Sequence, residues 1–274
     1  MIPLSDALMR RHRRRSATRR PSLVDLGPGR PSYAPKRPVL LFVLFAAALT
    51  VFLPLRAAQA EELEPFEASY NWIWHGMTVA FSTVKLERRD DTWVYRSKSD
   101  PRGIGRMLSE RPTQESIMRI TAAGTQPLSY KADDGTSDTK RDADVKFDWE
   151  HGRVTGVYEA TNVDMPLQPG IQDDLSVQIA LMVELLHGRT PDRFLIIDKN
   201  TAREYHYSRE GEETLETPLG SIQTIIYRSQ KQGSPRTTRF WCAPARGFIP
   251  IRVEQKRGED DVQWTMQIQD LKRG

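Results

Sequence analysis

The sequence predicts a mainly β (α+β) fold: a curved antiparallel sheet or open β-barrel of roughly ten strands, with one long helix packed on its concave face. Three observations lead to this prediction. After residue 60, apolar and polar residues alternate in many short runs, turns of hairpin length separate the runs, and one longer stretch has a helical pattern. Links this short favour a meander over parallel βαβ units.

The clearest strands lie near the two ends of this region. In residues 66–74, FEASYNWIW, every second residue is apolar, and residues 262–269, VQWTMQIQ, repeat the pattern. Alternate side chains of a strand point to opposite faces, so one face packs on a core and the other meets water. In residues 79–86 the apolar positions change parity, which predicts a β-bulge near Ser82 and Thr83.

Residues 173–188, DDLSVQIALMVELLHG, predict the helix. A Pro-Gly pair at 169–170 breaks the chain before it, Asp173 or Asp174 can cap its first N–H groups, and Gly188 ends it. We therefore interpret Asp173 and Ser176 as the cap and first-turn residues of the helix N-terminus. Apolar residues cover most of the helix circumference, which is typical of a buried helix.

Residues 1–60 have the features of a basic leader with a signal peptide. Residues 39–55 carry no charge, and Ala58-Gln59-Ala60 supplies the small residues that signal peptidase requires, so we expect cleavage after Ala60. The alternative is a signal anchor, because this apolar run approaches the length of about 20 residues that spans a bilayer. Both options place residues 61–274, a single β-rich envelope domain, in the periplasm, either free or anchored to the inner membrane by residues 39–55.

The charge of the chain is divided unevenly. The leader holds 11 of the 40 basic residues and two of the 36 acidic residues, so residues 61–274 have 29 basic and 34 acidic residues. The exported part therefore has no general attraction for nucleic acid or for anionic lipid headgroups. Cys242 is the only cysteine, which excludes a disulfide within one chain and a zinc site built from cysteines.

Several segments, in their order along the chain, resemble a bacterial exported family catalogued as domain of unknown function 3108. These segments are FEASYNWIWHGM, QDDLSVQIALM, ETPLGSIQT, RFWCAPARGFIPIRVE and TMQIQDL, and together they span most of residues 64–271. The resemblance implies an exported location and a β-rich domain, but no reaction. The general plan of the family is similar to the open barrels of bacterial lipoprotein carriers, which is an analogy of fold alone.

No catalytic set is evident after residue 60. Ser176 and His187 would lie three helical turns apart, too far to hydrogen-bond, and no G-x-S-x-G motif occurs. The acidic stretch 133–144 offers oxygen ligands for Ca²⁺, but its spacing does not fit an EF-hand loop, so we interpret it as a polar hairpin tip. We expect no enzymatic activity, no metal and no cofactor. An envelope hydrolase whose paired carboxylates come from distant strands is the remaining enzymatic alternative.

Large aromatic residues are the most suggestive feature of the domain. The residues that we consider for ligand binding are Tyr70, Trp72, Trp74, Trp149 and Trp264. The simplest interpretation is that these rings fill the core between sheet and helix. Alternatively, a sheet too wide for one helix leaves an apolar groove lined by aromatic residues, which is the usual form of a small-molecule site.

The leading hypothesis is a non-enzymatic envelope protein that binds an apolar or amphipathic ligand in the concave face of an open barrel. Lipid, lipoprotein and glycan are the ligands or partners that such a compartment offers. The alternative is a structural or interaction module with a filled core, which acts through its surface and strand edges. The volume of the interior distinguishes the two hypotheses.

Overall fold

The computed structural model describes residues 62–107, 111–258 and 261–274. The predicted leader, with its apolar run 39–55 and its cleavage point after Ala60, lies outside these ranges. Within them, no helix is both long enough and apolar enough to cross a membrane.

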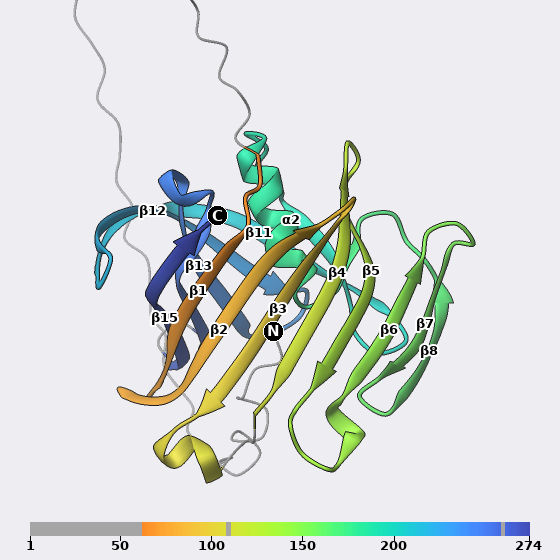
Figure 1. Ribbon diagram of the computed structural model, residues 1–274, viewed down its shortest axis with the longest axis horizontal. Helices are drawn as coiled ribbons and strands as arrows, with labels where there is room; N and C mark the ends of the chain where they lie inside the picture. Colours follow the sequence, from red (N-terminus) through yellow and green to blue (C-terminus); the bar gives the residue numbers. More distant parts are fainter. Residues whose placement is uncertain (1–61, 108–110, 259–260) are drawn as a thin grey trace, which may run out of the picture. The chain divides into compact units, whose positions relative to one another are not determined.

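Fifteen strands form one sheet, in the order β8-β7-β6-β5-β4-β3-β2-β1-β15-β14-β13-β12-β11-β10-β9 (Figure 1). The strands are β1 (Phe66–Trp74), β2 (Met77–Arg89), β3 (Thr92–Pro101), β4 (Thr113–Thr121), β5 (Gly124–Asp133), β6 (Ala143–Asp148), β7 (Arg153–Tyr158), β8 (Thr161–Pro166), β9 (Ile171–Gln172), β10 (Arg193–Ile197), β11 (Ala202–Thr217), β12 (Gly220–Lys231), β13 (Arg236–Ala243), β14 (Ile249–Arg257) and β15 (Asp261–Arg273). All ladders are antiparallel except the short one between β9 and β10. Because β1 pairs with β15, the first and last strands meet in the middle of the sheet.

The predicted antiparallel meander with one helix is confirmed, but the sheet has fifteen strands and not roughly ten. The strands missing from the prediction include β4 and β5, which turn polar or small residues inward, such as Ser116, Thr125 and Ala132. Their apolar periodicity is therefore weak. Conversely, residues 203–208, REYHYS, and 212–217, EETLET, each have the pattern of a separate strand, but both belong to the single strand β11, which continues through a bulge at Arg209–Gly211.

The helix, α2 (Ser176–Leu186), is shorter than the predicted 173–188. The residues before Ser176 form a turn and are not helical. In this turn the side chain of Asp173 accepts hydrogen bonds from the N–H groups of Leu175 and Ser176. Ten of its 11 residues are buried. The helix is thus enclosed on nearly all sides, which agrees with its unbroken apolar surface.

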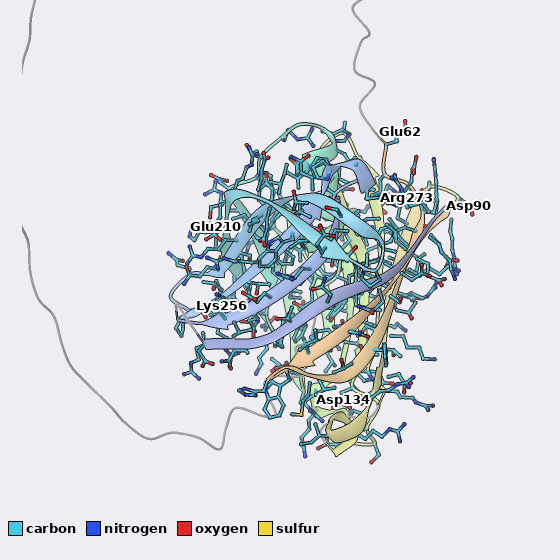
Figure 2. All side chains as sticks on the ribbon, turned by 90° about the vertical axis from the view of Figure 1, so that its left-hand side faces the viewer. Glu62, Asp90, Asp134, Glu210, Lys256 and Arg273 are labelled. Atoms are coloured by element: carbon cyan, nitrogen blue, oxygen red, sulfur yellow. The ribbon has the colours of Figure 1, made fainter. Side chains whose placement is uncertain are left out.

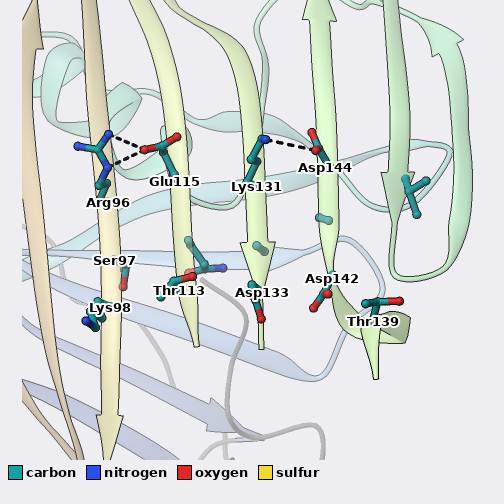
Figure 3. Close-up of a pocket in the computed structure, with 14 residues that line it drawn as sticks. Arg96, Ser97, Lys98, Thr113, Glu115, Lys131, Asp133, Thr139, Asp142 and Asp144 are labelled. Carbon is teal, nitrogen blue, oxygen red and sulfur yellow. Dashed lines mark hydrogen bonds and ion pairs between the residues drawn. The ribbon is translucent and has the colours of Figure 1, made fainter. Parts of the chain in front are cut away.

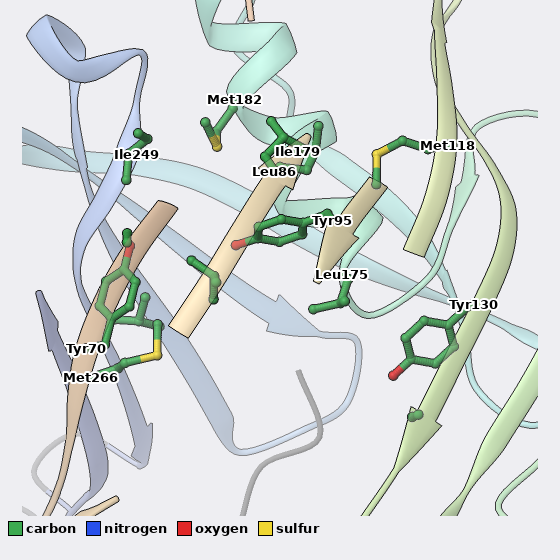
Figure 4. Close-up of a cluster of buried hydrophobic side chains, with 14 of the residues drawn as sticks. Tyr70, Leu86, Tyr95, Met118, Tyr130, Leu175, Ile179, Met182, Ile249 and Met266 are labelled. Carbon is green, nitrogen blue, oxygen red and sulfur yellow. The ribbon is translucent and has the colours of Figure 1, made fainter. Parts of the chain in front are cut away.

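Two apolar clusters enclose α2 inside the curled sheet. On one side Ile179 and Met182 join the main core, to which both halves of the sheet contribute buried residues (Figure 4). On the other side Leu181 and Leu185 pack with Tyr207 and other residues of β10 to β13. The predicted place of the helix on the concave face is therefore correct, and the helix fills the space between the two halves of the sheet.

The alternation predicted for the first and last strands is present. Phe66, Ala68, Tyr70 and Trp72 of β1 are buried, while their neighbours are partly exposed. In β15 the buried residues are Trp264, Met266 and Ile268. The predicted bulge occurs earlier than expected, because Trp72 pairs with Ala80 and Ile73 with Thr78, which leaves Val79 as the extra residue.

Each edge strand of the sheet makes a hydrogen bond to another part of the domain. At β8, the N–H of Asp164 donates a hydrogen bond of 2.8 Å to Oδ1 of Asn200 in the β10–β11 turn. Pro166, two residues after Asp164 in β8, faces the same edge and has no N–H group. At β9, Nε2 of Gln172 donates to the carbonyl of Thr125 on β5 at 2.8 Å. Unpaired strand edges invite pairing with other chains, and the contact at Asp164, the missing N–H of Pro166 and the two-residue length of β9 disfavour such pairing.

Candidate functional site

Three of the five aromatic residues considered for ligand binding lie in the core. The rings of Trp72 and Trp264 have centroids 4.8 Å apart, and the two side chains are only 5% and 7% exposed. Nε1 of Trp72 donates to Oγ of Ser82. The hydroxyl of Tyr70 donates to the carbonyl of Pro250 at 2.9 Å, and burial raises the pKa of this phenol. These rings hold β1 against β14 and β15.

Trp74 and Trp149 lie at opposite ends of the sheet. Trp74 is half-buried at the end of β1, with its ring 4.5 Å from that of His75. Trp149 lies in the β6–β7 turn, where its Nε1 donates to the carbonyl of Pro127 at 2.6 Å. In a meander, alternate turns lie at opposite ends, so the β1–β2 and β6–β7 turns are far apart. The structure therefore brings Trp74 close to the Trp72–Trp264 pair and separates Trp149 from it.

The end of the sheet beside Trp74 exposes large apolar side chains. Met77, the cross-strand partner of Trp74, is 49% exposed, Ile104 is 45% exposed and Val262 is 37% exposed. Ile104 belongs to the 3₁₀ helix η2 (Gly103–Met107), which is held to β2 by the hydrogen bond from the N–H of Arg102 to the carbonyl of Val79. We call Trp74, Met77, Ile104 and Val262 the apolar end patch. It lies at the end that Asp134 marks in Figure 2, opposite Glu62 and Arg273.

Sequence analysis did not single out Met77, Ile104 or Val262. Met77 and Val262 continue the inward parity of their strands, so the pattern alone predicts that they are buried. They are exposed because they lie beyond the last residues that face the core. Ile104 is in a short helix whose sequence, GIGRM, gives no periodic signal.

The segment Gln172–Ser176 forms a buried polar network that anchors α2. Asp173 is fully buried, and its carboxylate accepts hydrogen bonds from the N–H groups of Leu175 and Ser176 and from Oγ of Ser116 at 2.7 Å. Burial raises the pKa of Asp173 to about 6, although these hydrogen bonds act in the opposite direction. The N–H of Asp173 in turn donates to Oγ of Ser176 at 2.8 Å.

Asp174 extends this network to the far side of the sheet. Its Oδ2 accepts hydrogen bonds from the hydroxyls of Tyr158 at 2.5 Å and Tyr130 at 3.3 Å. Burial is the main cause that raises the pKa of both phenols, and the nearby carboxylate of Asp174 raises it further. The carboxylates of Asp173 and Asp174 and the hydroxyls that donate to them are all paired within the domain, so these contacts explain the position of the helix without requiring a ligand.

The outer face of β3 to β7 carries a groove of about 630 Å³ (Figure 3). Rows of charged side chains cross the strands there. In one row, Arg96 and Glu115 are 2.6 Å apart and Lys131 and Asp144 are 3.4 Å apart, so each charge has a partner. Lys98 lies in the next row, in the register that continues to Thr113 on β4 and Asp133 on β5.

Three aspartates of the acidic stretch meet at the β5–β6 turn. One carboxylate oxygen from each of Asp133, Asp134 and Asp142 lies within 4.8 Å of the others. Asp134 pairs with Arg141 at 2.5 Å, and the carboxylates of Asp133 and Asp142 accept backbone N–H groups of Gly135 and Asp134. The hydrogen bonds within the turn account for this arrangement, as expected for a polar hairpin tip.

The histidines of the described residues that make side-chain contacts do so at the surface. Nδ1 of His151 lies 2.8 Å from Asp148, and Nε2 of His206 lies 3.2 Å from Glu204. Ser176 and His187 are at opposite ends of α2, about 16 Å apart along its axis. Cys242 is fully buried, and burial raises the pKa of its thiol to about 12, which disfavours the reactive thiolate.

The fold and these surfaces define a β-barrel-like protein whose curled sheet encloses one helix. The family model described as "Protein of unknown function (DUF3108)" matches residues 66–266, so the chain belongs to this family. The family description assigns no enzymatic activity. A search of curated proteins finds no match.

The solved structures to which this chain is similar have very low sequence identity to it. The β-barrel-like protein of domain of unknown function DUF1849 from Brucella abortus is 10% identical, with a TM-score of 0.49 over 77% of this chain and 98% of that chain. A provisionally assigned lipoprotein from Parabacteroides distasonis is 7% identical, with a TM-score of 0.32 over 77% and 96%. A provisionally assigned exported protein with a YmcC-like fold from Bacteroides fragilis is 11% identical, with a TM-score of 0.28 over 77% and 96%.

Proposed function

We propose that residues 61–274 form an exported, non-enzymatic envelope protein that binds an amphipathic ligand at the apolar end patch. The observation that carries this proposal is the exposure of Met77, Ile104 and Val262 beside Trp74 at one end of the sheet. Exposed apolar clusters with polar surroundings are typical of sites that bind a ligand or partner. A lipid-like molecule would place its acyl part on this patch, whereas a glycan would stack on Trp74.

The concave face of the sheet offers little space for an enclosed ligand, which favours a ligand bound at the end of the sheet. The helix α2 occupies the concave face, and the cavity between its last turn and Phe66, Ile249 and Arg273 has a volume of only about 10 Å³. A single water molecule needs about 10–15 Å³ by a comparable measure. An acyl chain therefore has no room there, and we place the ligand at the end patch in preference to the core residues Tyr70, Trp72 and Trp264.

The cellular location in this proposal rests on the leader. A basic segment, the uncharged residues 39–55 and the small residues before Ala60 support export to the periplasm. A retained signal anchor would hold the same domain on the periplasmic side of the inner membrane. In both cases the domain meets lipids, lipoproteins and glycans.

A hydrophobic dye tests the apolar end patch. The exported protein, purified from the envelope fraction, is titrated with a dye that fluoresces on apolar surfaces, alongside Met77→Ser and Val262→Ser. Val157→Ser is the matched control, because Val157 is 46% exposed but lies on β7, where it lines the outer groove and not the patch. We expect the two patch variants to lower dye binding and the control to leave it unchanged. Equal binding by all four proteins would refute the proposal.

The second candidate function is an interaction module that acts through its outer surface. The buried helix on the concave face favours it, as does the contact of Asn200 with the edge strand β8. Because the two-residue length of β9 and the contact at β8 disfavour an added strand, a partner would bind side chains of the outer surface. Crosslinking to a defined envelope protein that persists in Met77→Ser and Val262→Ser supports this function over the first.

A further inference from the structure

We propose that the groove on the outer face of β3 to β7 binds a short zwitterionic peptide, with the peptide carboxylate at Lys98 and its ammonium group at Asp133 and Asp142. The groove has a volume of about 630 Å³, within the range of about 300–1,000 Å³ that is usual for small-molecule sites. This site is separate from the apolar end patch, and its ligand class is different.

Opposite walls of the groove carry opposite charges. Lys98 on β3 pairs in register with Thr113 at the start of β4, and Thr113 pairs with Asp133 at the end of β5. Asp142 lies beside Asp133 just before β6. One strand, β4, therefore separates the basic wall from the acidic wall. The side chain of β4 that lies between them is Thr113, which ends in a hydroxyl group.

Lys98, Asp133 and Asp142 differ from the neighbouring charged residues because no side chain of opposite charge in the described part of the chain pairs with them. One row away, Glu115 pairs with Arg96 and Asp144 pairs with Lys131. Among the described residues Lys98 has no carboxylate partner, and Asp133 and Asp142 accept only backbone N–H groups of Gly135 and Asp134, at 2.7 and 3.2 Å. A ligand with one cation and one anion would supply both missing partners.

The distance between the walls sets the length of the ligand. Neighbouring strands lie about 4.8 Å apart, so the backbones at Lys98 and Asp133 are separated by about 10 Å. An extended peptide spans about 3.3–3.6 Å per residue, so a tripeptide with free ends matches this separation. The hydroxyls of Thr113 and Thr139, which line the groove, can bond its peptide groups. A divalent cation, in contrast, would use only the acidic wall and leave Lys98 unpaired.

Calorimetric titration with three peptides tests this inference. The exported protein is titrated at physiological salt with tri-alanine, with its N-acetylated form and with its C-terminal amide. We expect tri-alanine to bind and each blocked form to bind about fivefold more weakly, since each loses one exposed ion pair. Lys98→Gln should abolish the preference for the free carboxylate. The double variant Asp133→Asn, Asp142→Asn should abolish the preference for the free amine.

Lys272→Gln is the matched control, because Lys272 is an exposed lysine on β15, outside the groove. It should bind all three peptides as the unchanged protein does. Equal binding of the free and blocked peptides, or no binding of tri-alanine, overturns the inference. Binding of Ca²⁺ without binding of tri-alanine overturns it as well, because the acidic wall alone would then be a cation site. Dye binding at the apolar end patch is also measured in Lys98→Gln, and this variant should bind the dye as the unchanged protein does. Failure of the peptide proposal can then be distinguished from failure of the end-patch proposal.

Discussion

The hydroxyl of Ser116 on β4 donates a hydrogen bond of 2.7 Å to Oδ2 of Asp173, a fully buried carboxylate 57 residues further along the chain. The other oxygen of Asp173 accepts the N–H groups of Leu175 and Ser176 at the start of α2. One carboxylate therefore caps the helix and fixes it to the sheet. This contact determines where the helix lies and, consequently, how little space remains in the interior.

Asp173→Ala should lower the free energy of unfolding by about 2–4 kcal/mol, because it removes a helix cap and leaves buried polar groups without partners. Urea unfolding followed by circular dichroism measures this change. Asp270→Ala is the control, since Asp270 is an exposed residue of β15 and its loss should cost less than about 0.5 kcal/mol. Equal effects of the two substitutions would show that Asp173 does not anchor the helix.

The same carboxyl predicts a pH dependence of stability. Burial raises the pKa of Asp173 from 3.8 to about 6 in the folded protein. Between these values the folded state holds a proton that the unfolded state has released, so the contribution of Asp173 to stability falls as the pH rises. A shift of about two pKa units corresponds to about 3 kcal/mol.

Asp173→Asn retains the shape of this side chain but does not titrate. The unfolding free energy of the unchanged protein, minus that of Asp173→Asn, should therefore decrease by up to about 3 kcal/mol between about pH 4 and pH 6.5 and stay constant above. Urea titrations across this range give the difference. Two parallel stability curves would mean that Asp173 titrates normally.

The two tryptophans nearest the apolar end should differ in their effects on stability. Trp264→Ala removes a buried ring that packs at a tilt against Trp72, and we expect a loss of about 3–5 kcal/mol. Trp74→Ala removes a half-buried ring and should cost about 1 kcal/mol, while it weakens dye binding. Chemical unfolding measures both. A larger cost for Trp74 than for Trp264 would contradict the assignment of one to the end patch and the other to the core.

Asn200 should protect the edge strand β8. Asn200→Ala removes the acceptor for the N–H of Asp164, so the amide of Asp164 should exchange its hydrogen about fivefold faster, as loss of about 1 kcal/mol implies. Amide exchange followed by NMR measures the rate. The amides of β1, in the middle of the sheet, serve as internal controls and should keep their rates. Unchanged exchange at Asp164 would show that the side chain of Asn200 does not cover the edge.

Local patterns in the sequence predict the strands that face the core with apolar residues. Tyr70, Trp72 and Trp264 alternate with polar neighbours, and the structure buries all three. The helix is also evident from its sequence, but its length is not. Its first turn depends on the contact of Asp173 with Ser116, a residue in another part of the chain.

The two proposed sites depend on contacts that the sequence pattern does not contain. Met77 and Val262 have the parity of core residues, and only the end of the sheet leaves them exposed. Lys98 and Asp133 are 35 positions apart and come into one register only through the pairing of β3, β4 and β5. Strand register and the extent of the core are properties of the whole sheet.

Native mass spectrometry of the exported protein tests the central claim most directly. The protein is purified from the envelope without detergent, and the unchanged chain is compared with the double variant Met77→Ser, Val262→Ser. We predict that the unchanged chain carries an added mass which organic solvent extracts as an amphipathic molecule, and that the double variant carries much less of it. No added mass in either protein, or the same amount in both, would contradict binding at the apolar end patch.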